Sequence, residues 1–180
     1  MPMPSRLVPF LDRAKIEKLN EALGRRISED FRKILGPDES ILVVITLKGA
    51  MFFGADLLRH ITVPMEIDFV RLSSYGVGVA SSGQVRILKD IECSPEGRHV
   101  LLIDEIVDSG RTLDFLASRI RSQQPRTVKI AALLSKPSRR EIPVAVDYMG
   151  LEVEDKFLVG YGLDLAERYR NLDGIFALEE

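Results

Sequence analysis

Hydrophobic residues follow two different spacings along this chain. Between residues 11 and 35 they recur at intervals of three and four, which indicates one amphipathic helix or two successive ones. The runs at 41–47 and 99–104 are instead continuous and apolar, which is typical of strands buried on both faces of a sheet. Further strands are predicted at 65–72 and 127–135, and helices at 51–61 and from about 111 to 122.

The order of these elements predicts the fold class. Strands that alternate with helices imply an α/β fold with a mostly parallel, doubly wound sheet and helices on both faces. Three shorter strands are expected towards the C-terminus, near 146–149, 157–160 and 174–178. In a sheet of this kind, ligands bind beyond the carboxyl ends of the strands. Residues that directly follow the predicted strands are therefore the first candidates for a functional site.

Composition and charge narrow the range of functions. The chain has 180 residues, of which 46% are hydrophobic and 29% charged, as expected for one globular domain. Its net charge of -2 provides no bulk attraction to nucleic acid or to an anionic membrane. The longest apolar run, 41–47, is far shorter than the roughly 20 residues of a membrane helix. With Cys93 alone, no intramolecular disulfide can form. We expect a cytoplasmic protein without a nucleic-acid or membrane partner.

The segment 101–112 carries the strongest chemical signal. The strand predicted there ends in two adjacent carboxylates, Asp104 and Glu105, and a third carboxylate, Asp108, opens a turn of small residues before a helix. The backbone N–H groups at such a helix start form a site for a phosphate. They belong to Ser109, Gly110, Arg111 and Thr112. Carboxylates beside a phosphate site suit a ligand with hydroxyls or bound magnesium, such as a ribose phosphate.

Simpler interpretations of the same residues stay open at this point. Asp108 or Ser109 could be a plain helix N-cap, and Asp104 and Glu105 could be solvated at a strand end. Other phosphate motifs are absent from the sequence: there is no G-x-x-x-x-G-K-[ST] segment, and the glycines at 76–78 lack the third glycine of a dinucleotide-binding turn. The two histidines have no sequence partner that suggests catalysis, and no His/Cys cluster suggests zinc.

The segment LLIDEIVDSGRTL resembles the phosphoribosyl-pyrophosphate motif of type I phosphoribosyltransferases, in its hypoxanthine-guanine form. Further segments resemble the family in the same order along the chain: 47–57, 68–75, 129–136, 155–164 and 168–172. The resemblance implies the type I fold in one domain over 1–180, with a small base-binding hood built from the N-terminal segment and about 145–180. The family's acidic pair usually reads Glu-Asp, whereas this chain has Asp104-Glu105. Which carboxylate contacts the ribose and which the metal is therefore open.

The resemblance also implies a reaction. The 5-phosphoribosyl group passes from phosphoribosyl pyrophosphate to N9 of hypoxanthine or guanine, giving IMP or GMP and pyrophosphate, with Mg²⁺ as cofactor. Asp108 is the expected catalytic residue, which handles the proton at N7 of the purine. The phosphoribosyl group is expected to meet Asp104, Glu105, Asp108, Ser109, Gly110, Arg111 and Thr112. The expected metal ligands are Asp104, Glu105 and Asp164.

The remaining expected contacts concern pyrophosphate and base. For pyrophosphate they are Lys48, Gly49, Ser74, Tyr75 and Arg170, and the Lys48-Gly49 peptide is a candidate cis bond. Ser74 and Tyr75 open a Gly/Ser-rich loop, 73–84, that is expected to close over the site. For the base they are Lys136, Phe157, Leu158 and Asp164.

Each of these residues also has a plain structural alternative. Lys136 could be a solvated lysine after a strand, and Phe157 could belong to the core. The pair Arg139 and Arg140 is interpreted as a solvated turn.

Two other functions are compatible with parts of this sequence. The enzyme could use another base such as xanthine, because a lysine donor accepts any 6-oxopurine. A regulator of the same fold could instead bind nucleotide or RNA without turnover. The net charge of -2 and the lack of residues for an added DNA-binding domain argue against the regulator. The family resemblance further implies a homodimer or homotetramer.

Overall fold

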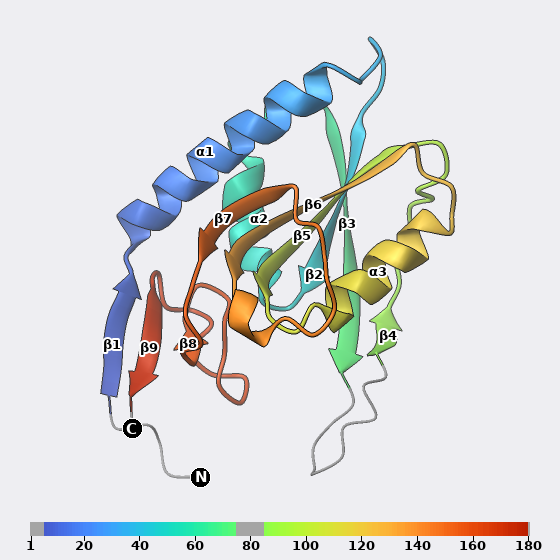
Figure 1. The fold of residues 1–180 in the computed structure, drawn as a ribbon. Coiled ribbons are helices and arrows are strands. Elements are labelled where there is room, and N and C mark those ends of the chain that lie inside the picture. Colours follow the sequence, from blue (N-terminus) through green and yellow to red (C-terminus); the bar gives the residue numbers. More distant parts are fainter. Residues whose placement is uncertain (1–5, 75–84, 180) are drawn as a thin grey trace.

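The computed structural model describes residues 6–74 and 85–179. Its centre is a six-stranded sheet in the order β4-β3-β2-β5-β6-β7 (Figure 1). The strands are β2 (Ile41–Leu47), β3 (Met65–Ser74), β4 (Val85–Lys89), β5 (His99–Val107), β6 (Thr127–Ser135) and β7 (Tyr148–Glu152). All neighbours pair in parallel except β3 and β4, which are antiparallel. The mostly parallel sheet predicted from the alternation of strands and helices is confirmed.

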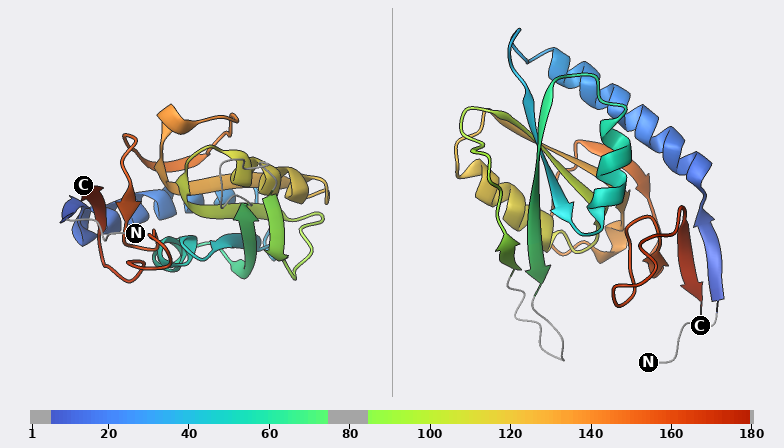
Figure 2. Two further views of the ribbon diagram at one scale, coloured as in Figure 1. Left: turned by 90° about the horizontal axis from the view of Figure 1, so that it is seen from below. Right: turned by 180° about the vertical axis from the view of Figure 1, so that it is seen from behind.

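Helices cover both faces of this sheet (Figure 2). Helices α1 (Arg13–Arg32) and α2 (Ala50–Leu58) pack in one hydrophobic cluster, and α3 (Arg111–Arg121) packs in a second cluster on the other face. The odd residues of β2, Ile41, Val43 and Ile45, belong to the first cluster, and the even residues Leu42 and Val44 to the second. Such alternation explains why β2 is apolar at every position, since both of its faces are buried.

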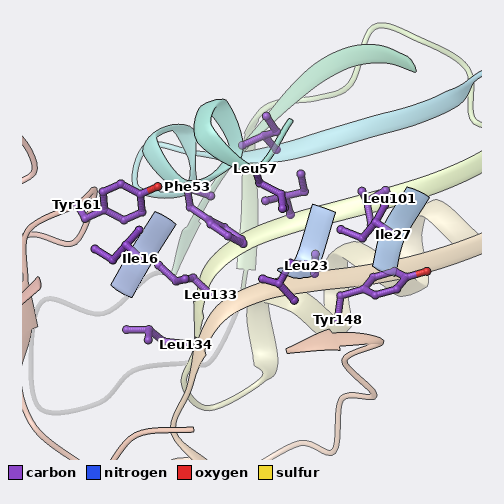
Figure 3. Close-up of a cluster of buried hydrophobic side chains, with 14 of the residues drawn as sticks. Ile16, Leu23, Ile27, Phe53, Leu57, Leu101, Leu133, Leu134, Tyr148 and Tyr161 are labelled. Carbon is purple, nitrogen blue, oxygen red and sulfur yellow. The ribbon is translucent and has the colours of Figure 1, made fainter. Parts of the chain in front are cut away.

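Helix α1 accounts for the hydrophobic spacing at the start of the chain. Asp12 caps it, because the Asp12 side chain accepts a hydrogen bond from the Lys15 N–H at 2.8 Å. Ile16, Leu23 and Ile27 then point from one face of the helix into the larger cluster, where Figure 3 places them beside side chains of α2 and of the sheet. The hydrophobic spacing in 11–35 was compatible with one helix or two, and the structure shows one continuous helix.

A second, three-stranded sheet forms the hood. It has the order β1-β9-β8, with β1 (Arg6–Leu11), β8 (Leu158–Val159) and β9 (Ile175–Glu179), all antiparallel. The hood thus joins the N-terminal strand to the end of the chain (Figure 1). Within the expected 145–180 segment, β7 instead pairs with β6 and extends the main sheet.

Other differences from the expected elements concern edges and ends. Strands β1 and β4 were not predicted, and β5 runs on to Val107, three residues beyond the predicted end at 104. The expected loop 73–84 begins inside β3, and its residues 75–84 lie outside the described residues. Among the helices of the described ranges, none has the length and hydrophobicity needed to cross a bilayer.

Candidate active site

A cavity of about 220 Å³ opens at the carboxyl ends of β2 and β5. This is the edge of the sheet at which the fold class predicts ligand binding. Among the residues that line it are Thr46, Asp104, Glu105, Asp108, Ser109, Gly110 and Thr112. The structure therefore brings three residues of the predicted phosphate turn and the three predicted carboxylates to a single cavity. Arg111 does not line it, and its guanidinium donates to Glu141 at 2.7 Å.

The turn between β5 and α3 has the shape of an anion site. Gly110 is the residue before the helix and has a φ of 87°, a left-handed conformation that glycine adopts without strain. A Cβ at this position would also overlap the Ile142 carbonyl oxygen, so both the backbone conformation and the available space require glycine. Neither Asp108 nor Ser109 occupies the N-cap position, which makes the plain N-cap interpretation wrong. The first N–H groups of α3 have no acceptor within the helix, and that of Arg111 donates to the Ser109 hydroxyl at 3.4 Å. A helix start of this kind is a site for an anion.

The acidic pair is held in place by the neighbouring strand. The Thr46 hydroxyl donates to Asp104 Oδ1 at 2.6 Å, and the Glu105 N–H donates to the same oxygen at 3.1 Å. Glu105 lies so close to the backbone of Gly49 that a Cβ there would overlap its carboxylate. Thr46 was missed in the sequence because its role depends on the pairing of β2 with β5.

Burial acts on the charge of both carboxyl groups. It raises the pKa of Asp104. The pKa of Glu105 lies well above its usual range, first because of burial and then because of the adjacent Asp104 charge. Both side chains are only partly exposed and lie within β5, and Asp104 accepts from Thr46, so the pair is not a solvated strand end. Two like charges in one partly buried place favour a cation or a hydroxyl-bearing ligand.

The turn between β2 and α2 lies next to the acidic pair. The cis peptide bond of this turn joins Leu47 and Lys48, one bond before the candidate Lys48-Gly49 bond. The Lys48 ammonium contacts Glu167 Oε2 at 2.7 Å and thereby connects the turn to the segment that follows β8. Lys48 is thus held by a residue more than a hundred positions away.

Arg170 and Asp164 form an ion pair in the same segment. Arg170 Nη2 lies 2.8 Å from Asp164 Oδ1, and Arg170 Nη1 donates to the Gly162 carbonyl at 2.7 Å. No group of three or more Asp, Glu, His or Cys side chains suited to a metal occurs among the residues that the structure describes. Asp164 therefore does not form a three-carboxylate cluster with the acidic pair. Its assignment as a metal ligand stays a prediction.

The residues expected at the base follow β6 and open β8. Lys136 is only 7% exposed and its ammonium donates to the Lys156 carbonyl at 2.6 Å, so it is not a solvated lysine. Phe157 is 53% exposed, so it does not belong to the core either. Leu158 is the buried first residue of β8. Both plain structural alternatives at Lys136 and Phe157 are therefore wrong.

The solvated turn expected at Arg139 and Arg140 is correct only in part, because Arg139 is about half exposed but both side chains have partners. Arg139 Nε lies 2.8 Å from Asp108 Oδ1, and Arg140 Nη2 donates to the Ser135 hydroxyl at 2.7 Å. Both belong to the turn that follows β6, and β6 is the neighbour of β5 in the sheet. The strand order could have indicated this contact, because the turns that follow two neighbouring parallel strands lie at the same edge of the sheet.

A family model described as "Phosphoribosyl transferase domain" matches residues 11–166. The match spans most of the chain and includes both turns and the acidic pair. The chain belongs to the phosphoribosyltransferase family. It shares with this family the type I fold seen here, a mostly parallel sheet with helices on both faces.

Individual relatives of this phosphoribosyltransferase agree with the family match. The hypoxanthine-guanine phosphoribosyltransferase of Bacillus subtilis is 43% identical over 94% of this chain and 92% of its own. A bifunctional TilS/HprT protein of Listeria innocua is 47% identical over 91% of this chain, but this covers only 24% of the Listeria protein. A solved hypoxanthine phosphoribosyltransferase from Staphylococcus aureus has a TM-score of 0.88 and 34% identity, covering 98% of this chain and 92% of its own.

The described geometry suits the chemistry of a phosphoribosyltransferase. Displacement of pyrophosphate from a ribose requires a site for the 5-phosphate, groups for the ribose hydroxyls and a means of balancing charge on the leaving group. The helix start after Gly110 and the acidic pair are two such parts, and they line one cavity. Asp108, at the opening of the same turn, lies within that cavity as well.

Proposed function

We propose that this phosphoribosyltransferase is a purine salvage enzyme. It transfers the 5-phosphoribosyl group from phosphoribosyl pyrophosphate to N9 of hypoxanthine or guanine and releases IMP or GMP and pyrophosphate. The observation that carries the proposal is the single cavity in which a phosphate-binding turn, an acidic pair and Asp108 meet. The relatives named as hypoxanthine-guanine enzymes support the choice of base.

Within this proposal the turn after β5 holds the phosphoribosyl group. The N–H groups and side chains from Ser109 to Thr112 bind the 5-phosphate at the start of α3. The carboxylates of Asp104 and Glu105 accept hydrogen bonds from the ribose hydroxyls, which are charge-assisted and therefore strong. Asp108 takes the proton at N7 as the purine bonds to the ribose, which is general acid–base catalysis by a positioned carboxylate.

Phosphoribosyltransferases generally use Mg²⁺ with phosphoribosyl pyrophosphate, and the acidic pair fits this ion. Magnesium binds oxygen ligands and commonly takes only one or two carboxylates, with substrate oxygens and waters completing its shell. Asp104 and Glu105 are two partly buried carboxylates whose pKa values burial raises, so a cation between them and the substrate would offset that cost. When bound, the ion would balance charge on the departing pyrophosphate. Asp164 is the third proposed ligand.

Lys136 provides the preference for 6-oxopurines. An ammonium donates to a carbonyl oxygen and cannot accept from an exocyclic amine, so it favours hypoxanthine and guanine over adenine. It already donates to a carbonyl, that of Lys156. The exposed ring of Phe157 offers a flat apolar face for stacking on the base. The backbone of Leu158 and the carboxylate of Asp164 would meet the Watson–Crick edge and the amine of guanine.

Pyrophosphate is assigned to the turn after β2 and to Arg170. Lys48 and Gly49 belong to this turn, and a guanidinium such as that of Arg170 grips phosphate oxygens bidentately. Arg170 would have to exchange part of its pairing with Asp164 for this contact. Ser74 is the last residue of β3, whereas Tyr75 and most of the proposed closing loop lie outside the described residues. The lid role of 73–84 stays a prediction.

Location and assembly are proposed from the family alone. We expect a cytoplasmic homodimer or homotetramer with no nucleic-acid or membrane partner. Sedimentation equilibrium of the purified chain measures the assembly directly.

The test of the proposed function is consumption of phosphoribosyl pyrophosphate with Mg²⁺ and each of hypoxanthine, guanine, xanthine and adenine. We expect turnover with hypoxanthine or guanine and none with adenine. The Asp108→Asn variant should lower kcat by roughly 10²–10⁴ with little change in KM, as for lost general acid–base catalysis. Comparable use of adenine, or an unchanged kcat in the folded variant, would contradict the assignment. Binding of phosphoribosyl pyrophosphate without turnover of any base would favour the regulator.

A further inference from the structure

The turn that follows β6 is fastened to the turn that follows β5. The Lys136 N–H donates to the Val107 carbonyl at 2.9 Å, just before Asp108. Beyond the short 3₁₀ helix Pro137–Arg139, the N–H groups of Glu141 and Ile142 both donate to the Ser109 carbonyl, at 2.9 and 3.0 Å. Backbone hydrogen bonds thus hold the two turns together on both sides of Asp108. A side chain from the second turn can therefore hold a fixed position relative to the first.

Four charged side chains form a row of ion pairs between the two turns. Arg139 Nε lies 2.8 Å from Asp108 Oδ1, and Arg139 Nη1 lies 3.4 Å from both oxygens of Asp155. Asp155 Oδ1 lies 3.6 Å from the ammonium of Lys136. The order Asp108–Arg139–Asp155–Lys136 alternates negative and positive charge. It joins the residue proposed for N7 of the purine to the residue proposed for its 6-oxo group.

The exposure of the central pair argues against a purely structural role. The side chains of Arg139 and Asp108 are 51% and 46% exposed, although Asp108 Oδ1 itself is buried. Exposed ion pairs contribute little to stability, because water and salt screen them. A purine bound between Asp108 and Lys136 would cover the pair and exclude water, which strengthens the same contact. The pair therefore matters most in the complex.

We propose that Arg139 is a positioning residue for the proton transfer at N7. It holds Asp108 by Oδ1, so that Oδ2 is the oxygen presented to the purine. Asp155 in turn lies 3.4 Å from Arg139 Nη1 and helps to hold the guanidinium in place. The inference rests on the proposed role of Asp108, because Arg139 acts only through that carboxylate.

The first measurement is steady-state kinetics of Arg139→Gln with hypoxanthine. We expect kcat to fall by about tenfold to a hundredfold, as for a misplaced catalytic group. The KM for phosphoribosyl pyrophosphate should stay within about twofold, because the acidic pair and the phosphate turn are untouched. The matched control is Arg126→Gln, which removes an equally exposed arginine from an ion pair with Glu39 away from the cavity. It should leave kcat unchanged. A parent-like kcat in Arg139→Gln overturns the inference.

The second measurement is a double-mutant cycle with Asp108→Asn. If Arg139 acts through Asp108, then adding Arg139→Gln to Asp108→Asn should change kcat by less than about twofold. An equal loss in both backgrounds would mean that Arg139 acts elsewhere, and it overturns the inference. A parent-like Asp108→Asn variant would instead remove the proposed role of Asp108. If Asp108→Asn has a low kcat but Arg139→Gln has the kcat of the parent, only the positioning role of Arg139 is overturned. Failure of the inference can therefore be told apart from failure of the proposed role of Asp108.

Discussion

Gly49 lies directly against the carboxylate of Glu105. It follows β2, and its backbone conformation, with a φ of -63°, is one that any residue can adopt. What favours glycine is space, since a Cβ would overlap Oε1 and the carboxyl carbon of Glu105 and that side chain would have to move. The absence of one side chain thus allows the turn after β2 and the acidic pair of β5 to share the same small cavity.

Gly49→Ala should therefore displace Glu105 and weaken binding of magnesium phosphoribosyl pyrophosphate. Each charge-assisted hydrogen bond lost is worth about 1.5–3 kcal/mol, which corresponds to tenfold or more in the dissociation constant. Gly36→Ala is the matched control, because a Cβ at position 36 would come no closer than 3.4 Å to Glu39. Isothermal titration calorimetry measures both affinities. Parent-like binding by Gly49→Ala would mean that Glu105 has no part in the ligand site.

Individual residues differed in how far the sequence alone could assign them. Asp104, Glu105 and Asp108 lie in one short segment, where strand, turn and helix start are all visible as local patterns. Arg139 is more than thirty positions away, and its contact with Asp108 exists only because β5 and β6 are neighbours. Local patterns indicate that Arg139 is exposed, but they carry no information about its contact with Asp108.

At the scale of elements, Tyr161 joins the hood segment to two helices. Its hydroxyl donates to Asp56 of α2 at 2.8 Å and accepts from the Asn20 amide of α1 at 3.0 Å. Arg13 of α1 contacts the same Asp56 at 2.7 Å. Burial, followed by the Asp56 contact, raises the pKa of Tyr161, so it remains a neutral donor. The segment that carries Asp164 and Arg170 is anchored to the core through this cluster.

Tyr161→Phe should lower the free energy of unfolding by about 1–3 kcal/mol, because it leaves the buried Asn20 amide without this partner. Tyr148→Phe is the control. The Tyr148 hydroxyl makes a longer bond, 3.3 Å, to Asp30, whose side chain is 54% exposed and can turn to water. Its loss should cost about 1 kcal/mol or less. Urea unfolding measures both. Equal costs would show that the Tyr161 cluster does not anchor the hood.

Long, apolar or regularly spaced elements were predictable, and so were the short C-terminal strands β7, β8 and β9, whereas β1 and β4 were not. The spacing in 11–35 and the runs of β2, β5 and β6 reflect burial, which the sequence records directly. Strand β1 contains Pro9 and pairs with β9 at the other end of the chain, while β4 pairs only with β3. Such strands are fixed by their partners more than by their own residues.

At the scale of the whole molecule, the acidic pair opposes the stability of the unliganded fold. In the folded state, the pKa of Asp104 is raised by burial, and that of Glu105 by burial and then by Asp104. The folded protein therefore holds these protons at pH values where the unfolded chain has released them. Its stability falls as the pH rises from the ordinary carboxyl range through the raised pKa values, and the full cost is present above them. Bound magnesium and substrate should offset that cost.

Asp104→Asn with Glu105→Gln removes both charges while keeping side-chain size. Without ligand, the variant should be more stable than the parent at pH 8, by on the order of 1–3 kcal/mol. The difference should shrink as the pH approaches about 4, where the parent's carboxyls are protonated as well. Magnesium phosphoribosyl pyrophosphate should raise the Tm of the parent, because it binds only the folded state, and should raise that of the variant much less.

Glu66→Gln provides the control of opposite sign. The guanidinium of Arg98 lowers the pKa of Glu66, so this carboxylate stabilises the fold when ionised and loses its contribution as the pH falls. Its removal should lower Tm at pH 8 and leave the ligand-induced rise intact. Thermal unfolding of the three proteins between pH 4 and 8, with and without ligand, separates the two effects. If the double variant unfolds at or below the Tm of the parent and still gains the full rise with ligand, the pair neither opposes folding nor holds the substrate. Magnesium and the ribose would then have to be bound by other groups.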